Sequence, residues 1–131
     1  MDPYAIFNLK FEEFLTDLVE TYPEETDLQA MRNMLDWSIK FLGVRVPQEM
    51  FNTCVAIPYG DKIMKKNEDF FLEECDYSNK QYVDINIVNK LKSKWRGLSP
   101  DNKEVVWKYM HVLMLINNKC LKLTESNISK T

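Results

Sequence analysis

Large apolar side chains recur once per helical turn through the first part of the chain, and this period limits the fold more than any other feature. The stripe advances in steps of three and four residues, opposite a row of acids. Because Pro23 cannot continue a helix, the pattern predicts a helix from about Asp2 to Thr21. The members of the stripe are Phe7, Phe11, Phe14, Leu15, Leu18, Val19 and Tyr22.

A second helix is predicted after the short loop at residues 22–26. Thr26 and Gln29 have the spacing of a capping box, in which two side chains satisfy backbone N–H groups at the helix start. Gly43 is typical of the residue that ends a helix. A loop this short predicts that the first two helices pack antiparallel. The predicted buried face of the second helix is Leu28, Met31, Leu35, Ile39 and Leu42.

The middle of the chain is less regular. Pro47 fits the first turn of a short helix. Pro58 and Gly60 predict a break, followed by another short helix near 61–66. Residues 67–82 have no clear period and predict a loop or a single helical turn.

Two further helices complete the pattern. Asp84 is a candidate cap for a helix that contains Trp95 and Leu98. Ser99 and Pro100 have the N-cap and first-turn chemistry of a last helix. The buried stripe predicted for this last helix is Val105, Val106, Tyr109, Val112, Leu113 and Ile116.

These segments add up to one helical domain. No stretch alternates as a strand does, so the sequence predicts an all-α, single-domain bundle of about five or six helices with short loops over residues 1–122. The polar residues at 123–131 are predicted to form a frayed tail. A chain of 131 residues with 45% hydrophobic and 28% charged residues is typical of a globular protein with a sizeable core.

The N-terminus and the cysteines predict a reducing compartment. The first residues lack the basic start of a signal peptide, and no apolar run approaches the ~20 residues that span a bilayer. We therefore expect a protein that is neither secreted nor in a membrane. Cys54, Cys75 and Cys120 form no CxxC pair, which argues against a disulfide framework and a structural zinc site.

Enzyme signatures are missing from the sequence. Three glycines could hardly build a phosphate-binding loop, and the acids between residues 68 and 76 lack the order of a calcium-binding loop. We expect no catalytic residue, metal, cofactor or small-molecule substrate. A third class of function is an enzyme that acts through Cys54 or His111. The sequence does not decide this class, because a nucleophile needs a base beside it and only the fold could bring the two together.

Charge is distributed unevenly along the chain. Residues 1–79 contain 7 basic and 16 acidic residues, whereas residues 80–131 contain 10 basic and 4 acidic ones. The two halves either neutralise each other inside one fold or present faces for self-association or for a polyanion. The segment at 89–98, NKLKSKWRGL, is either a solvated helix face or a nucleic-acid-binding helix. Its candidate nucleic-acid contacts are Lys90, Lys92, Lys94 and Arg96.

Protein–protein interaction is the leading interpretation. The last helix is apolar on nearly all sides from Tyr109 to Ile116, so it is either central in its bundle or covered partly by a partner. The second helix places Met34 and Trp37 beside its own stripe, and methionine and tryptophan suit adaptable contacts. Candidate contacts to a protein partner, or to a second copy, are Trp37, Trp107, Met110 and Met114.

Two segments, FFLEECDY at 70–77 and LKSKWRGLSPDNKEVVWKYMHVLMLI at 91–116, resemble small helical proteins of giant, nucleocytoplasmic large DNA viruses. A Phe-rich first helix followed by a Tyr-Pro-Glu turn also matches that layout. The resemblance includes no catalytic motif, so no functional residue is carried over. It implies a protein of a large DNA virus, and together with the apolar Met and Trp residues above it leads us to expect a non-enzymatic interaction protein, either a virion component or a factor in the host cytoplasm.

Overall fold

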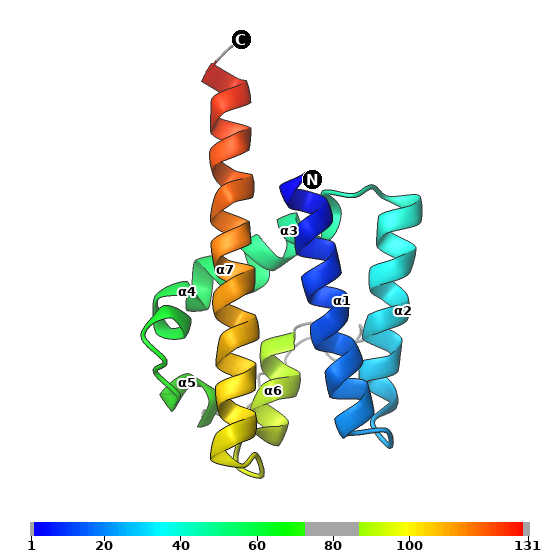
Figure 1. Ribbon diagram of the computed structural model, residues 1–131, viewed down its shortest axis with the longest axis vertical. Helices are drawn as coiled ribbons and strands as arrows, with labels where there is room; N and C mark the ends of the chain where they lie inside the picture. Colours follow the sequence, from blue (N-terminus) through cyan, green and yellow to red (C-terminus); the bar gives the residue numbers. More distant parts are fainter. Residues whose placement is uncertain (1, 73–86, 130–131) are drawn as a thin grey trace.

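The computed structural model describes residues 2–72 and 87–129, and all regular secondary structure in these ranges is helical (Figure 1). The prediction of an all-α bundle is confirmed. Within this part of the chain, every helix is too short or too polar to cross a lipid bilayer. In chain order the elements are α1 (Pro3–Thr21), α2 (Thr26–Phe41), α3 (Val46–Phe51), the π-helical η1 (Asn52–Ala56), α4 (Ile57–Met64), α5 (Asp69–Leu72), α6 (Ile87–Trp95) and α7 (Pro100–Ser129). The predicted cap Asp84 and the thiol of Cys75 lie outside the described residues.

Two of the predicted helix starts are confirmed by their caps. The Asp2 side chain accepts a hydrogen bond of 2.9 Å from the N–H of Tyr4, at the start of α1. At the start of α7, Ser99 Oγ accepts one of 3.2 Å from the N–H of Asn102. The capping box predicted for α2 is wrong, because the N-cap position belongs to Glu25, whose side chain makes no capping hydrogen bond. That carboxylate instead bonds to lysines of α6.

The helices α1 and α2 lie side by side and antiparallel, as predicted (Figure 1). Gly43 ends α2 with a φ of 126°, a conformation that glycine adopts without steric cost, and its N–H bonds to the Ser38 carbonyl at 3.0 Å. The side-chain amide of Asn8, on α1, donates to the Val44 carbonyl at 2.9 Å. This bond joins α1 to the loop that follows α2.

The predicted break at Pro58 and Gly60 is wrong, since the helical backbone continues from Val46 to Met64. The N–H of Ile57 bonds to the Asn52 carbonyl, five residues back, in the wider π turn. Pro58 follows in the first turn of α4, so its missing N–H falls where the hydrogen-bond pattern changes from π to α.

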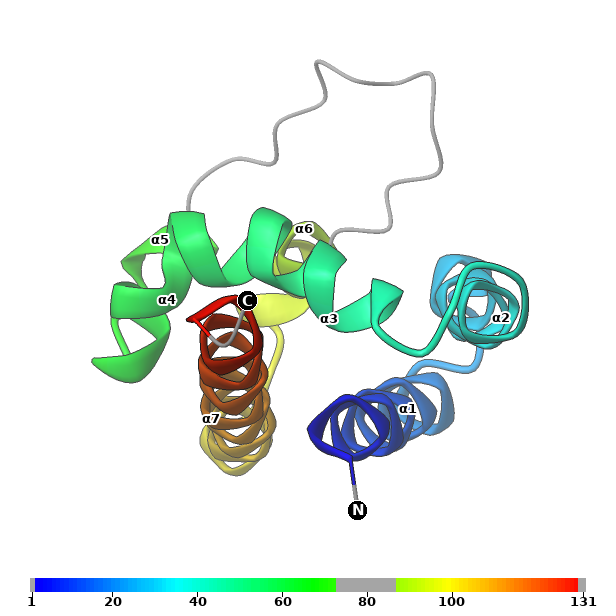
Figure 2. The ribbon, with the colours of Figure 1, turned by 90° about the horizontal axis from the view of Figure 1, so that it is seen from above.

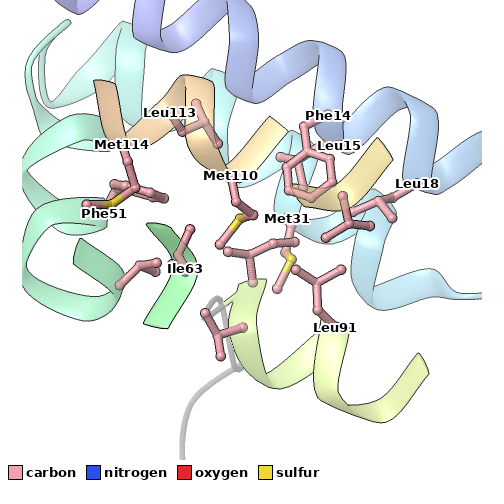
Figure 3. Packing of buried hydrophobic residues seen from close by; sticks show 14 of the residues in the cluster. Phe14, Leu15, Leu18, Met31, Phe51, Ile63, Leu91, Met110, Leu113 and Met114 are labelled. Carbon is pink, nitrogen blue, oxygen red and sulfur yellow. The ribbon is translucent and has the colours of Figure 1, made fainter. Parts of the chain in front are cut away.

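The core lies between α7 and the helices around it, which are α1, α3, α4 and α6 (Figure 2). Met110 and Leu113 of α7 are fully buried and point among side chains of α1, α4 and α6 (Figure 3). At one end of the bundle, Phe71 stacks on Trp95 with ring centroids 4.3 Å apart. A Cβ added to the buried Gly60 would lie 3.0 Å from Cε of Met114, so α4 and α7 are closely packed.

The last helix departs from its prediction in two respects. Val105 and Val112, expected in the buried stripe, are exposed, because the buried side of α7 is centred on Val106, Met110 and Leu113. The helix also continues to Ser129, through most of the predicted frayed tail, and extends past the other helices (Figure 1).

Candidate protein-binding surface

A row of exposed apolar side chains runs along α2. It consists of Ala30, Met34, Trp37 and Phe41, which we call the α2 stripe. Phe41 is 70% exposed, Trp37 47% and Met34 44%, and Ala30 is half-buried. The rings of Trp37 and Phe41 are tilted with centroids 5.7 Å apart, so they form one continuous apolar surface. Such a surface on a folded protein commonly marks a contact site.

The α2 stripe is exposed because α2 lies at one edge of the bundle (Figure 2). Another side of α2, which contains the buried Leu28, Met31 and Leu35, packs on α1 and α3. Beyond the helix, Leu42 and Val44 are 57% and 39% exposed and add to the apolar surface. The prediction that Leu42 belongs to the buried face is wrong, because Leu42 is 57% exposed at the C-cap, just beyond the last residue of α2.

Three of the four predicted contact residues lie in the core. Trp107 is 5% exposed, Met110 0% and Met114 7%. Trp107 packs edge-on against Trp95 with ring centroids 5.2 Å apart. These three residues are therefore part of the packed side of α7 and are removed from the candidate surface, whereas Val112 and Leu115 of the same helix are exposed. Only Trp37 remains from that set.

The acidic and basic parts of the chain meet between α2 and α6. The ammonium of Lys90 lies 3.1 Å from carboxylate oxygens of both Glu25 and Asp27, and Lys94 also bonds to Glu25. Hydrogen bonds from Lys94 and then Lys90 lower the pKa of Glu25. Burial acts to lower the pKa of Lys90, but the hydrogen bonds to Asp27 and Glu25 outweigh it and raise that pKa. Opposite charges thus meet inside one fold here.

The rest of the basic segment is also partly occupied. Lys92 lies over the ring of Tyr59, with 5.6 Å between its ammonium nitrogen and the ring centroid. Trp95 is fully buried, and its indole N–H donates to Glu68 at 3.0 Å, so it is not available for stacking on a base. Of the four predicted nucleic-acid contacts, Lys90, Lys92 and Lys94 have these partners within the chain, while Arg96 is exposed.

His111 and Cys120 each have a structural environment in the described part of the chain. The ring of His111 is half-buried, and Nε2 lies 2.7 Å from the Ile63 carbonyl, which can only accept, so Nε2 carries the proton. Cys120 is buried, and burial raises its thiol pKa, which disfavours the reactive thiolate. Cys54 is exposed. Within residues 2–72 and 87–129, no three His, Cys, Asp or Glu side chains gather as metal ligands would.

Sequence reasoning missed Phe41, the most exposed member of the α2 stripe. The signal is present: the four residues follow one another at spacings of four, three and four, which place them on one narrow line of a helix. The buried face of α2 has similar spacing, and spacing alone does not show which of the two lines is exposed.

The described residues define a small helical bundle in which α2 presents an exposed apolar stripe. Comparisons with protein-family models, with curated proteins and with solved structures find no match to this chain.

Proposed function

We propose that this protein is a non-enzymatic interaction protein that docks a protein partner through the α2 stripe. The observation that carries the proposal is the exposure of Trp37 and Phe41 side by side on α2. Burial of a large apolar side chain against a partner is worth roughly 1.5–3 kcal/mol. Aromatic residues are also the usual anchors of protein interfaces.

Neighbouring residues suit the same role. Met34 has a flexible side chain that adapts to different partner surfaces. Asp36 and Lys40, both exposed beside the stripe, supply the polar rim that a protein interface needs to orient its partner. The resemblance to helical proteins of giant viruses supports a viral or host protein as the partner, in the host cytoplasm or in the virion.

The test is capture of a partner by the full chain and by two variants. Trp37→Asp places a charge in the centre of the α2 stripe. Ile57→Asp places the same charge at a side chain that is 73% exposed on α4, away from the stripe. We expect the wild type and Ile57→Asp to capture the same partner, and Trp37→Asp to bind it at least ~10-fold more weakly, since 1.4 kcal/mol corresponds to tenfold.

Equal capture by all three proteins, each confirmed as folded by circular dichroism, would remove the α2 stripe as the docking surface. Titration with DNA and RNA at about 50 mM and 200 mM salt is the parallel control for nucleic-acid binding. A steep loss of affinity with salt that Lys92→Ala and Arg96→Ala reduce, and Trp37→Asp does not, would favour the basic helix over α2.

A further inference from the structure

The residues of the α2 stripe have the spacing of a helix-pairing seam. Steps of four, three and four residues repeat the pattern by which two α-helices pack along a narrow line. The same helix has an inward line, Leu28, Met31 and Leu35, that packs on α1 and α3. Among the described residues, α2 thus has two packing faces, and the outward one stays exposed. A partner that fits it is another helix.

The side chains of the α2 stripe complement themselves when one helix is reversed. If two copies of α2 lie antiparallel about a point between Met34 and Trp37, Phe41 of each copy faces Ala30 of the other. In the same register Trp37 faces Met34. Each large side chain then meets a smaller one, which fills the seam evenly. A parallel pair would place Phe41 on Phe41 and Ala30 on Ala30.

Charge favours the same orientation. Next to the beginning of α2 lies the exposed carboxylate of Glu24, and near its end lies the exposed ammonium of Lys40. Asp27 and Arg45 add to the two ends, although Asp27 also pairs with Lys90 and Arg45 lies over the ring of Tyr4. An antiparallel pair brings the acidic end of each helix towards the basic end of the other. It also opposes the two helix dipoles, and a parallel pair would bring like charges together.

From these relationships we infer that the α2 helices of two copies of this chain pair antiparallel to form a twofold symmetric dimer. The inference rests on the proposed function, because it names the partner of the same docking surface. A contact of this kind is isologous, so each copy contributes the same residues. One helix of 16 residues provides an interface at the small end of the specific range. We therefore expect a dissociation constant in the micromolar range.

Sedimentation velocity of the full chain over about 5–500 µM tests whether the dimer forms. The wild type and Ile57→Asp are expected to pass from monomer to dimer in this range, and Trp37→Asp is expected to associate at least ~10-fold more weakly. A wild type that stays monomeric, or a dimer that Trp37→Asp leaves intact, overturns the inference.

The orientation is tested by distances between spin labels. Gln29 and Asp36 are exposed on the same side of α2, seven residues apart, and each is replaced by cysteine in a chain with Cys54→Ser and Cys75→Ser. At a rise of 1.5 Å per residue, the antiparallel register separates the two labels at 29 by about 20 Å along the helix, and those at 36 by only about 2 Å. Equal distances at the two positions would show a parallel pair and overturn the register.

The two proposals fail in different ways. A monomeric wild type that still captures another protein through Trp37 overturns the dimer and supports the proposed docking surface. If Trp37→Asp alters neither sedimentation nor capture, the docking surface itself is overturned, and the dimer with it.

Discussion

Gln48 and Asn117 share a hydrogen bond of 2.7 Å between side chains that are 3% and 1% exposed. The bond joins α3 to α7. The amide of Asn117 then donates to Asn52 Oδ1 at 3.0 Å, at the first residue of η1. These three amides form a polar connection through an otherwise apolar contact, and they fix α3 and η1 against the central helix.

Loss of one partner in this connection should destabilise the fold. In Asn117→Leu the Gln48 amide stays buried without its acceptor, which costs about 1–3 kcal/mol in the free energy of unfolding. The double variant Gln48→Met with Asn117→Leu removes both polar groups and should recover much of that loss. Urea denaturation of the three proteins measures the effect, and a double variant no more stable than Asn117→Leu would contradict it.

The three tryptophans should differ in their accessibility to solvent. Trp37 is 47% exposed, whereas Trp95 and Trp107 are 0% and 5% exposed. Acrylamide should therefore quench mainly Trp37, and Trp37→Phe should remove most of the quenchable fluorescence without a loss of stability. Trp107→Phe is the matched control and should keep that component. Unchanged quenching in Trp37→Phe would place Trp37 in the interior.

Stability in acid should depend on Glu25. Hydrogen bonds from Lys94 and Lys90 lower its pKa in the folded protein from the ordinary value of 4.5. A lowered pKa stabilises the fold above pH 4.5, and this contribution disappears as the pH falls through the lowered value. We expect Glu25→Gln to be less stable than the wild type at pH 7, and the difference to shrink below pH 4.5.

Glu24→Gln is the control for that comparison, because Glu24 is exposed and adjacent. Urea denaturation at several pH values between 7 and about 3 gives the differences, since acidic side chains titrate in this range. A difference between Glu25→Gln and the wild type that stays constant over the whole range would show that the ion pairs do not contribute.

Ionisation of Tyr109 should weaken the contact between α1 and α7. Burial, followed by its hydrogen bond to Asp17, raises the pKa of Tyr109 from 10.0 to about 12. The corresponding stabilisation is complete below pH 10.0 and is lost as the pH rises towards 12. The ultraviolet titration of the wild type minus that of Tyr109→Phe isolates this phenol. Asp17→Asn should move its midpoint towards 10, the ordinary tyrosine value, and an unchanged midpoint would contradict the role of Asp17.

Local chemistry predicted the elements of the fold well. The apolar period predicted α1 and most of α2, and the capping residues predicted the start of α7. These signals act within a few residues of the chain, so they can be recognised in the sequence. Position within the bundle was harder to predict. The apolar period around Met110 does not show which side of the helix is buried, and only the packing of α7 against its neighbours places Met110 inside and Val112 and Leu115 outside.

The candidate surface was predicted only through Trp37, for the same reason. Trp37 and Trp107 are the same residue type, but Trp37 lies on an exposed side of α2 and Trp107 on the buried side of α7. Likewise, the sequence of α6 alone is compatible with a polyanion-binding site. The structure shows that two of its lysines, Lys90 and Lys94, are paired with Glu25. Contacts between residues more than sixty positions apart leave no local pattern.

The π turn of η1 determines how this part of the chain responds to the loss of one residue. Each residue of an α-helix advances the direction of the side chains by about 100°. The π turn contains one residue more than an α turn, so deletion of one residue between 52 and 56 would leave an α turn and keep Ile63, which is 0% exposed, facing α7. An alignment of related chains can therefore place a gap of one residue at η1 and keep the buried side of α4 in register, whereas the same gap inside α4 would turn the residues that follow it by about 100°.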